Sequence, residues 1–227
     1  MKLFYALSFF TIIHFSANAQ DASTKKSAQL ADFTLGFGSG QSTISFGYFK
    51  NWNLGKKQSF YIGTGVRLSN AFGKNQVFTS APASLAANSA NKDSLFSTSA
   101  STYALNAILN LGYHISPKLD VGFNIDLIGV SFGPSRIKLF SGNGTSTTTT
   151  AEPTGMNVLL VGNNDRGTLN SEFYLKYKVN NKIGIKFAYQ HFFTELTTAS
   201  KVQTQPAQND RFRNITNLFG IGVAYHF

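Results

Sequence analysis

The most constraining feature of this sequence is an alternation of large apolar residues with small or polar ones. It is clearest over residues 215–227, where the apolar positions are Ile215, Phe219, Ile221, Val223, Tyr225 and Phe227. A period of two places successive side chains on opposite faces of a β-strand. The pattern therefore predicts strands with one apolar face.

The residue composition indicates that this apolar face meets lipid. Charged residues make up 13% of the chain and aromatic residues 14%, with 22 Phe, whereas soluble domains average about 25% charged residues. The mean hydropathy is nevertheless −0.08. No run of about 18 apolar residues occurs, so helices that span a membrane are not expected.

The first residues have the organisation of an export signal. Lys2 precedes an apolar run from Leu3 to Phe15, and Ala17-Asn18-Ala19 provides the small residues of a cleavage site. A membrane anchor is the alternative, but this run is too short to cross about 30 Å of hydrocarbon. We therefore expect a signal peptide at 1–19, a short periplasmic tail at 20–30 and a barrel domain at 31–227.

The formal net charge of +10 could indicate several acidic partners. An exported chain does not meet the genome, and its basic residues form no cluster with interleaved aromatic residues, so no nucleic acid partner is expected. The long connections carry a mild excess of basic residues. They could contact surface lipid phosphates or surface glycans, or could form an ordinary solvated rim.

Eight alternating segments are joined by connections whose lengths also alternate. The segments begin near residues 31, 42, 58, 101, 119, 172, 183 and 215, and the fifth changes phase near Gly129, which suggests a bulge. The short turns lie at 53–57, 116–118 and 180–182, and a tight first hairpin at 38–41 is the exception. The long connections are 73–98, 133–168, which contains the low-complexity tract Thr145–Thr150, and 196–212.

This layout predicts a closed antiparallel eight-stranded transmembrane β-barrel with short periplasmic turns and long extracellular loops, in the bacterial outer membrane. A soluble barrel is the alternative, but its interior could not enclose about forty large side chains. Charge placement also favours the membrane barrel, because Lys50 is the one charge on the apolar face. Tyr and Trp residues near the strand ends would form interfacial girdles: Tyr48, Trp52, Tyr103, Tyr113, Tyr177 and Tyr225.

The opposite face collects a lumen charge cluster of four cations and four anions. Its members are Asp32, Arg67, Asp120, Asp126, Glu172, Lys176, Lys178 and Lys186. Side chains fill the interior of an eight-stranded barrel, so paired ions that plug the lumen are favoured over a polar passage. Lys176 and Lys186 should lie nearly opposite each other, with Asp126 or Glu172 as the intervening acid.

The C-terminal pattern carries a resemblance to known proteins. Phe219, Ile221, Val223, Tyr225 and the terminal Phe227 resemble the signal that the outer-membrane barrel assembly machinery recognises. Over residues 31–227 the chain resembles the small eight-stranded outer-membrane barrels. Its Ala19-Gln20 junction, Gly-aromatic strands and Asn/Lys turns resemble the PorT-like branch. That branch implies a part in protein secretion, and it supplies no functional residue that can be transferred to this sequence.

The sequence offers weak candidates for an enzyme. His114 and Ser116 could suggest a lipid-modifying pair, but Ser116 opens a periplasmic turn and a complete triad is lacking. His191 and Glu195 have no serine partner, the histidines lack metal-ligand spacing, and Gly36–Gly40 precedes no helix.

We therefore expect no catalytic, cofactor or metal site. The expected role is a non-enzymatic structural or interaction role at the cell surface, accessory to protein secretion. A narrow porin-like channel for small solutes is the alternative.

Overall fold

The computed structural model describes residues 26–142, 144–160 and 164–227. The expected signal peptide (1–19) lies outside the described residues. The elements are β1 (Ser27–Gly38), β2 (Gln41–Leu54), β3 (Phe60–Ser80), α1 (Ala83–Ala86), η1 (Ser89–Asn91), β4 (Ser94–Ser116), β5 (Leu119–Phe132), β6 (Arg136–Gly142), β7 (Thr145–Pro153), β8 (Met156–Val158), β9 (Leu169–Lys178), β10 (Ile183–Thr198) and β11 (Arg211–His226).

Eight of these strands close into an antiparallel ring. The order around the ring is β1-β2-β3-β4-β5-β9-β10-β11, and β11 pairs back onto β1. β1 begins at Ser27 and pairs with β2 from that residue, so the last part of the expected tail (20–30) belongs to the barrel wall. Ring closure leaves no unpaired edge along most of the wall, as a membrane requires.

The alternating residues face the directions that the sequence predicts. Large apolar side chains point outward and are exposed, among them Phe33, Phe46, Val66, Leu68, Phe173, Phe187, Phe219 and Val223. Their strand neighbours point inward and are buried. The expected phase change in β5 is present as a register shift in the β4–β5 ladder, where Leu127 is the unpaired residue. The fold is thus a closed transmembrane β-barrel with an apolar outer surface. Among the described residues, no helix has the length and apolar character needed to cross a membrane.

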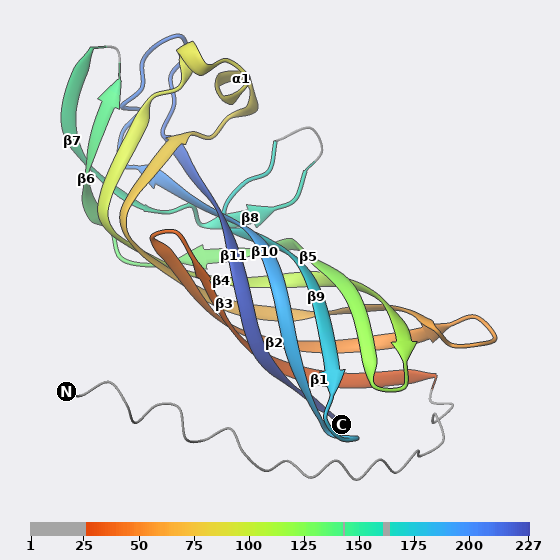
Figure 1. The fold of residues 1–227 in the computed structure, drawn as a ribbon. Coiled ribbons are helices and arrows are strands. Elements are labelled where there is room, and N and C mark those ends of the chain that lie inside the picture. Colours follow the sequence, from red (N-terminus) through yellow and green to blue (C-terminus); the bar gives the residue numbers. More distant parts are fainter. Residues whose placement is uncertain (1–25, 143, 161–163) are drawn as a thin grey trace, which may run out of the picture.

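The expected long loops are largely strands, and this corrects the prediction. β3 and β4 have 21 and 23 residues, about twice the 9–11 residues that cross a bilayer. Together with β6, β7 and the ends of β10 and β11, they form a structure that we call the extension, drawn at the upper left of Figure 1. The low-complexity tract Thr145–Thr150 lies in β7, where its β-branched side chains suit a strand.

The extension is itself a closed ring of six strands. The order is β11-β3-β4-β6-β7-β10, and it closes where Leu196 of β10 pairs with Phe212 of β11. One buried apolar residue from each of the six strands meets at the centre: Phe78, Leu95, Phe140, Ala151, Leu196 and Phe212. The helix α1 buries Leu85 beside this ring. The extension therefore has its own apolar core, independent of lipid.

The opposite end of the barrel, which we call the turn end, carries the short connections. β2–β3, β4–β5 and β9–β10 are joined there, and β11 ends there (Figure 1). The barrel thus has a short-turn end and an elaborated end, as outer-membrane barrels do.

Candidate functional site: the filled lumen

All eight residues of the predicted lumen charge cluster point into the barrel. Seven are almost fully buried, and Lys178 is partly exposed near the turn end. The cations and anions are equal in number, so the cluster is formally neutral. The cluster forms two networks of ion pairs and hydrogen bonds. One lies in the middle of the lumen, and the other lies near the turn end.

The middle network is centred on Glu172 of β9. Its carboxylate accepts hydrogen bonds from Lys186 Nζ at 3.0 Å, and from the amides of Asn124 and Gln190 at 2.8 Å each. Lys186 Nζ also lies 2.5 Å from Asp32 Oδ2 on β1, which β11 separates from β10 in the ring. This arrangement ties β1, β5, β9 and β10 together through side chains.

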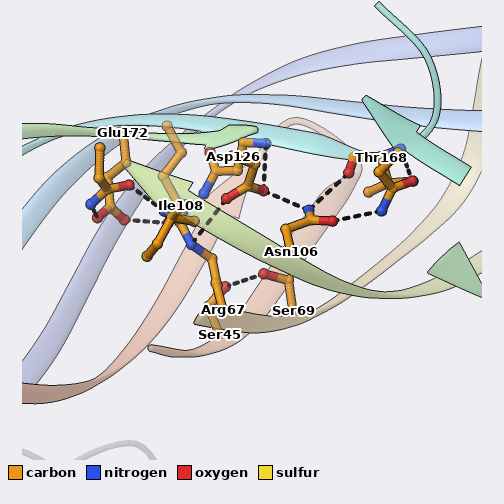
Figure 2. A network of polar contacts seen from close by, with 12 residues as sticks. Ser45, Arg67, Ser69, Asn106, Ile108, Asp126, Thr168 and Glu172 are labelled. Carbon is orange, nitrogen blue, oxygen red and sulfur yellow. Dashed lines mark hydrogen bonds and ion pairs between the residues drawn. The ribbon is translucent and has the colours of Figure 1, made fainter. Parts of the chain in front are cut away.

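Arg67 of β3 extends this network toward the extension. Its guanidinium donates to Asn124, and its Nε lies 3.5 Å from Asp126 Oδ1. Asp126 also accepts from Asn106 Nδ2 at 2.8 Å and from the backbone N–H of Asn170 at 2.9 Å. Figure 2 shows Arg67, Asp126, Asn106 and Glu172 as parts of one continuous network. A buried ion cluster of this kind is tolerated because each of its charged groups has an oppositely charged partner.

A single amide, Asn157 of β8, closes the network at the extension side. Its Nδ2 donates to Asn106 at 2.7 Å, and its Oδ1 accepts from Ser131 Oγ and from the N–H of Thr168, both at 2.8 Å. β8 pairs with β5 and belongs to the segment expected to be a loop (133–168). Sequence reasoning missed Asn157, because nothing in a Ser/Thr/Asn-rich connection marks one amide as buried.

The second network surrounds Asp120 at the start of β5. Its carboxylate lies 3.3 Å from the Nζ atoms of both Lys176 and Lys178, and 2.6 Å from His114 Nδ1. Lys176 and Lys186 are directly opposed in the β9–β10 ladder, as predicted. The expected acid Glu172 pairs with Lys186, but Asp126 does not intervene; Asp120 pairs with Lys176 instead. Asp126 is too far along β5 and reaches Arg67.

Two tyrosines, which we call the tyrosine layer, pack inside the barrel beside the two networks. The hydroxyls of Tyr61 and Tyr174 lie 2.9 Å apart, and Tyr174 donates to Asn110 at 2.9 Å. Gly112 and Gly122 make room for these rings, because a Cβ at either position would overlap the tyrosine beside it. The cavity beside this layer measures about 10 Å³, which is space for at most about one water molecule.

The candidate enzyme residues do not form a catalytic site within the described residues. Asp120 orients His114, but the other imidazole nitrogen of His114 faces Asn53 Oδ1 at 3.4 Å, and Ser116 Oγ accepts from the N–H of Lys118. No nucleophile therefore stands at hydrogen-bond distance from the imidazole. Glu195 is buried at the base of the extension, where it binds Arg211 at 2.8 Å and Arg213 at 3.0 Å. His191 instead contacts Asn217. In the described part of the chain, no group of three acidic, His or Cys side chains is placed to hold a metal ion.

Similarity to known proteins is found among solved structures, at 8–10% sequence identity. No protein-family model and no curated protein matches the chain. Similar solved structures include a de novo designed transmembrane β-barrel (TM-score 0.37, 10% identity, 89% of this chain and 98% of that one). Neisserial surface protein A has a TM-score of 0.36 at 9% identity, over 88% and 96% of the two chains. Ail, the attachment invasion locus protein of Yersinia pestis, has a TM-score of 0.34 at 10% identity, over 88% and 97%. Nothing about the role of this chain follows from these similarities.

Proposed function

We propose that the protein is a non-conducting outer-membrane barrel that holds a folded interaction module at the cell surface. The observation that carries this proposal is the pairing of a filled lumen with a six-stranded extension that has its own apolar core. Solute passage would need an open lumen, whereas a rigid module built on a plugged barrel suits contact with another macromolecule.

The orientation follows from the two ends of the barrel. Outer-membrane barrels keep short turns in the periplasm and elaborated connections outside the cell. The turn end would therefore face the periplasm, and the extension would face outward. The alternate residues Phe219, Ile221, Val223 and Tyr225 face outward at the end of β11, and the exposed Phe227 follows them. The assembly machinery would read them there during biogenesis.

The extension offers a contact surface on β6. Ile137 is 72% exposed and Leu139 43% exposed on its outer face, while Lys138 and Phe140 point inward. Exposed apolar residues on a water-facing strand favour contact with a partner. With the resemblance to the PorT-like branch, this surface supports an accessory role in protein secretion, through contact with secretion components.

Two measurements test the proposal. Purified protein in planar lipid bilayers should show no unitary conductance, and stable channels would favour the narrow porin-like alternative. In cells, a deletion strain should lose specific proteins from its medium or surface. The wild-type gene should restore them, whereas an Ile137→Asn/Leu139→Asn variant should not.

A matched control lies on the same hairpin. A Thr145→Asn/Thr147→Asn variant changes two exposed residues of β7 and should complement fully. An unchanged protein profile in the deletion strain would contradict the secretion role and leave a purely structural one. Equal behaviour of the two double variants would exclude β6 as the contact surface.

A further inference from the structure

The turn end of the barrel opens into a cavity of about 910 Å³, which we call the vestibule. Tyr61 of the tyrosine layer lines it, and Leu30 and Lys176 line both the vestibule and the small lumen cavity. Its volume is within the range of about 300–1,000 Å³ that ligand sites occupy, and mouths of β-barrels are a common place for such sites. The proposed function gives this cavity no role.

The lining of the vestibule is strongly basic. It includes Lys56, Lys57, Lys176 and Lys178, whereas Asp120 is its one acidic side chain. Lys176, Lys178 and His114 all share this carboxylate. One negative charge cannot neutralise two lysines, so the floor of the vestibule keeps an excess positive charge. The Lys56 and Lys57 side chains are exposed at the rim and add two more charges.

The basic residues occupy opposite walls. Lys56 and Lys57 lie in the β2–β3 turn, whereas Lys176 and Lys178 lie on β9. In the ring, β3 and β9 are separated by β4 and β5 on one side, and by β10, β11, β1 and β2 on the other. A ligand that reaches both groups must span the mouth and carry more than one negative charge.

The rest of the lining mixes apolar and polar groups. Leu30, Tyr61 and Pro117 contribute apolar surface. His226 also lines the vestibule, and its Nε2 has no hydrogen-bond partner among the described residues. Such a lining can take aliphatic side-chain stems as well as charges.

We propose that the vestibule binds an acidic peptide segment of a periplasmic protein through its carboxylates. Lysines act as separate point charges, and no Arg, with its fork suited to a single phosphate, is among the lining residues. Charges spread over two walls suit successive carboxylates along an extended chain better than one compact anion. The site itself is independent of the proposed surface function, and only the periplasmic source of the ligand rests on the orientation proposed above.

The test uses the full-length barrel purified in non-ionic detergent and a fluorescein-labelled hexaglutamate peptide, with hexaglutamine as the neutral probe. Fluorescence anisotropy should show binding of hexaglutamate that weakens as NaCl is raised, and no binding of hexaglutamine. The Lys56→Gln/Lys57→Gln variant should raise the Kd about tenfold or more, because it removes two charge-assisted contacts from one wall.

The chain supplies a matched control at the same rim. Lys118 and Lys182 lie in the other two short turns and outside the vestibule lining, so Lys118→Gln/Lys182→Gln makes the same change in net charge. This control should alter the Kd by less than about twofold.

Three results would overturn the proposal: no binding of hexaglutamate, equal losses in the two double variants, or displacement of the peptide by inorganic phosphate at equimolar concentration. Equal losses would mean that net charge alone attracts the peptide, and displacement by phosphate would mean a small-anion site. None of these results depends on conductance or on the secretion profile, so a failure here is distinguishable from a failure of the proposed function.

Discussion

The lumen network makes a strong prediction about Lys186. This lysine is 3% exposed and lies 2.5 Å from Asp32 and 3.0 Å from Glu172. A Lys186→Met substitution keeps the aliphatic volume but leaves two buried carboxylates without their shared cation. Glu172 keeps its two amide donors, whereas Asp32 loses its one ion-pair partner among the described residues.

The expected magnitude follows from this loss. Removing one partner from a buried ion pair costs about 3–5 kcal/mol, because the remaining charge is uncompensated. With a urea m-value of about 2 kcal/mol/M, the unfolding midpoint should fall by about 1.5–2.5 M. The fluorescence of Trp52, the single tryptophan, reports unfolding of the barrel from detergent micelles.

A second substitution distinguishes the cost of an unpaired buried carboxylate from the cost of packing lost at Lys186. In the Lys186→Met background, Asp32→Asn removes the stranded carboxylate, and the double variant should recover about 2 kcal/mol or more of the loss. Lys182→Met, in an exposed turn, should change stability by no more than about 0.5 kcal/mol. The reasoning would be refuted by a loss below about 1 kcal/mol in Lys186→Met, or by simple additivity in the double variant.

Three further predictions concern the extension and the tyrosine layer. Phe140→Ala removes an edge-to-face contact with Phe212, whose ring centroid lies 5.9 Å away; it should destabilise the extension by about 3–5 kcal/mol and expose it to protease, while the barrel keeps its heat-modifiable gel shift. Burial, with the nearby Arg136, lowers the pKa of Lys138 from 10.5 to about 8. The unfolded extension therefore binds more protons between these values, so its resistance to protease should increase from pH 8 to 10.5, and Lys138→Met should abolish this dependence. Gly122→Ala places a methyl group against Tyr174 and should lower barrel stability by about 1–3 kcal/mol in the same urea assay; unchanged stability would show that the ring can move.

Much of the barrel could be predicted because alternation reports strands and faces directly. A one-residue slip would turn every apolar side chain of a strand into the lumen, so the inward positions of Arg67, Lys176 and Lys186 followed from the pattern alone. Individual ion pairs were harder to predict. Asp126 and Asp120 lie on the same face of β5, and the choice between them depends on strand stagger, which the sequence does not specify.

The extension escaped prediction for a different physical reason. Outside the membrane, apolar side chains are expected to point into a protein core. On β6, however, Ile137 and Leu139 point outward while Lys138 points inward. The strand that completes the ring, β11, pairs with β3 more than a hundred positions earlier in the chain. The polar composition of this segment gives no indication of such a long-range pairing.

A rigid network of buried charged side chains lies between the two ends of the barrel. Buried contacts of Lys186, Glu172 and Arg67, the last through Asn124, join β1, β3, β5, β9 and β10. Because the interior is close-packed, neither end can move without disturbing buried charges. We therefore expect that a ligand in the vestibule does not change the conformation of the extension. The barrel would act as a rigid scaffold between a periplasmic contact and a surface contact. Binding of hexaglutamate should accordingly leave the protease sensitivity of the extension unchanged, and a change would show that the lumen network transmits a signal.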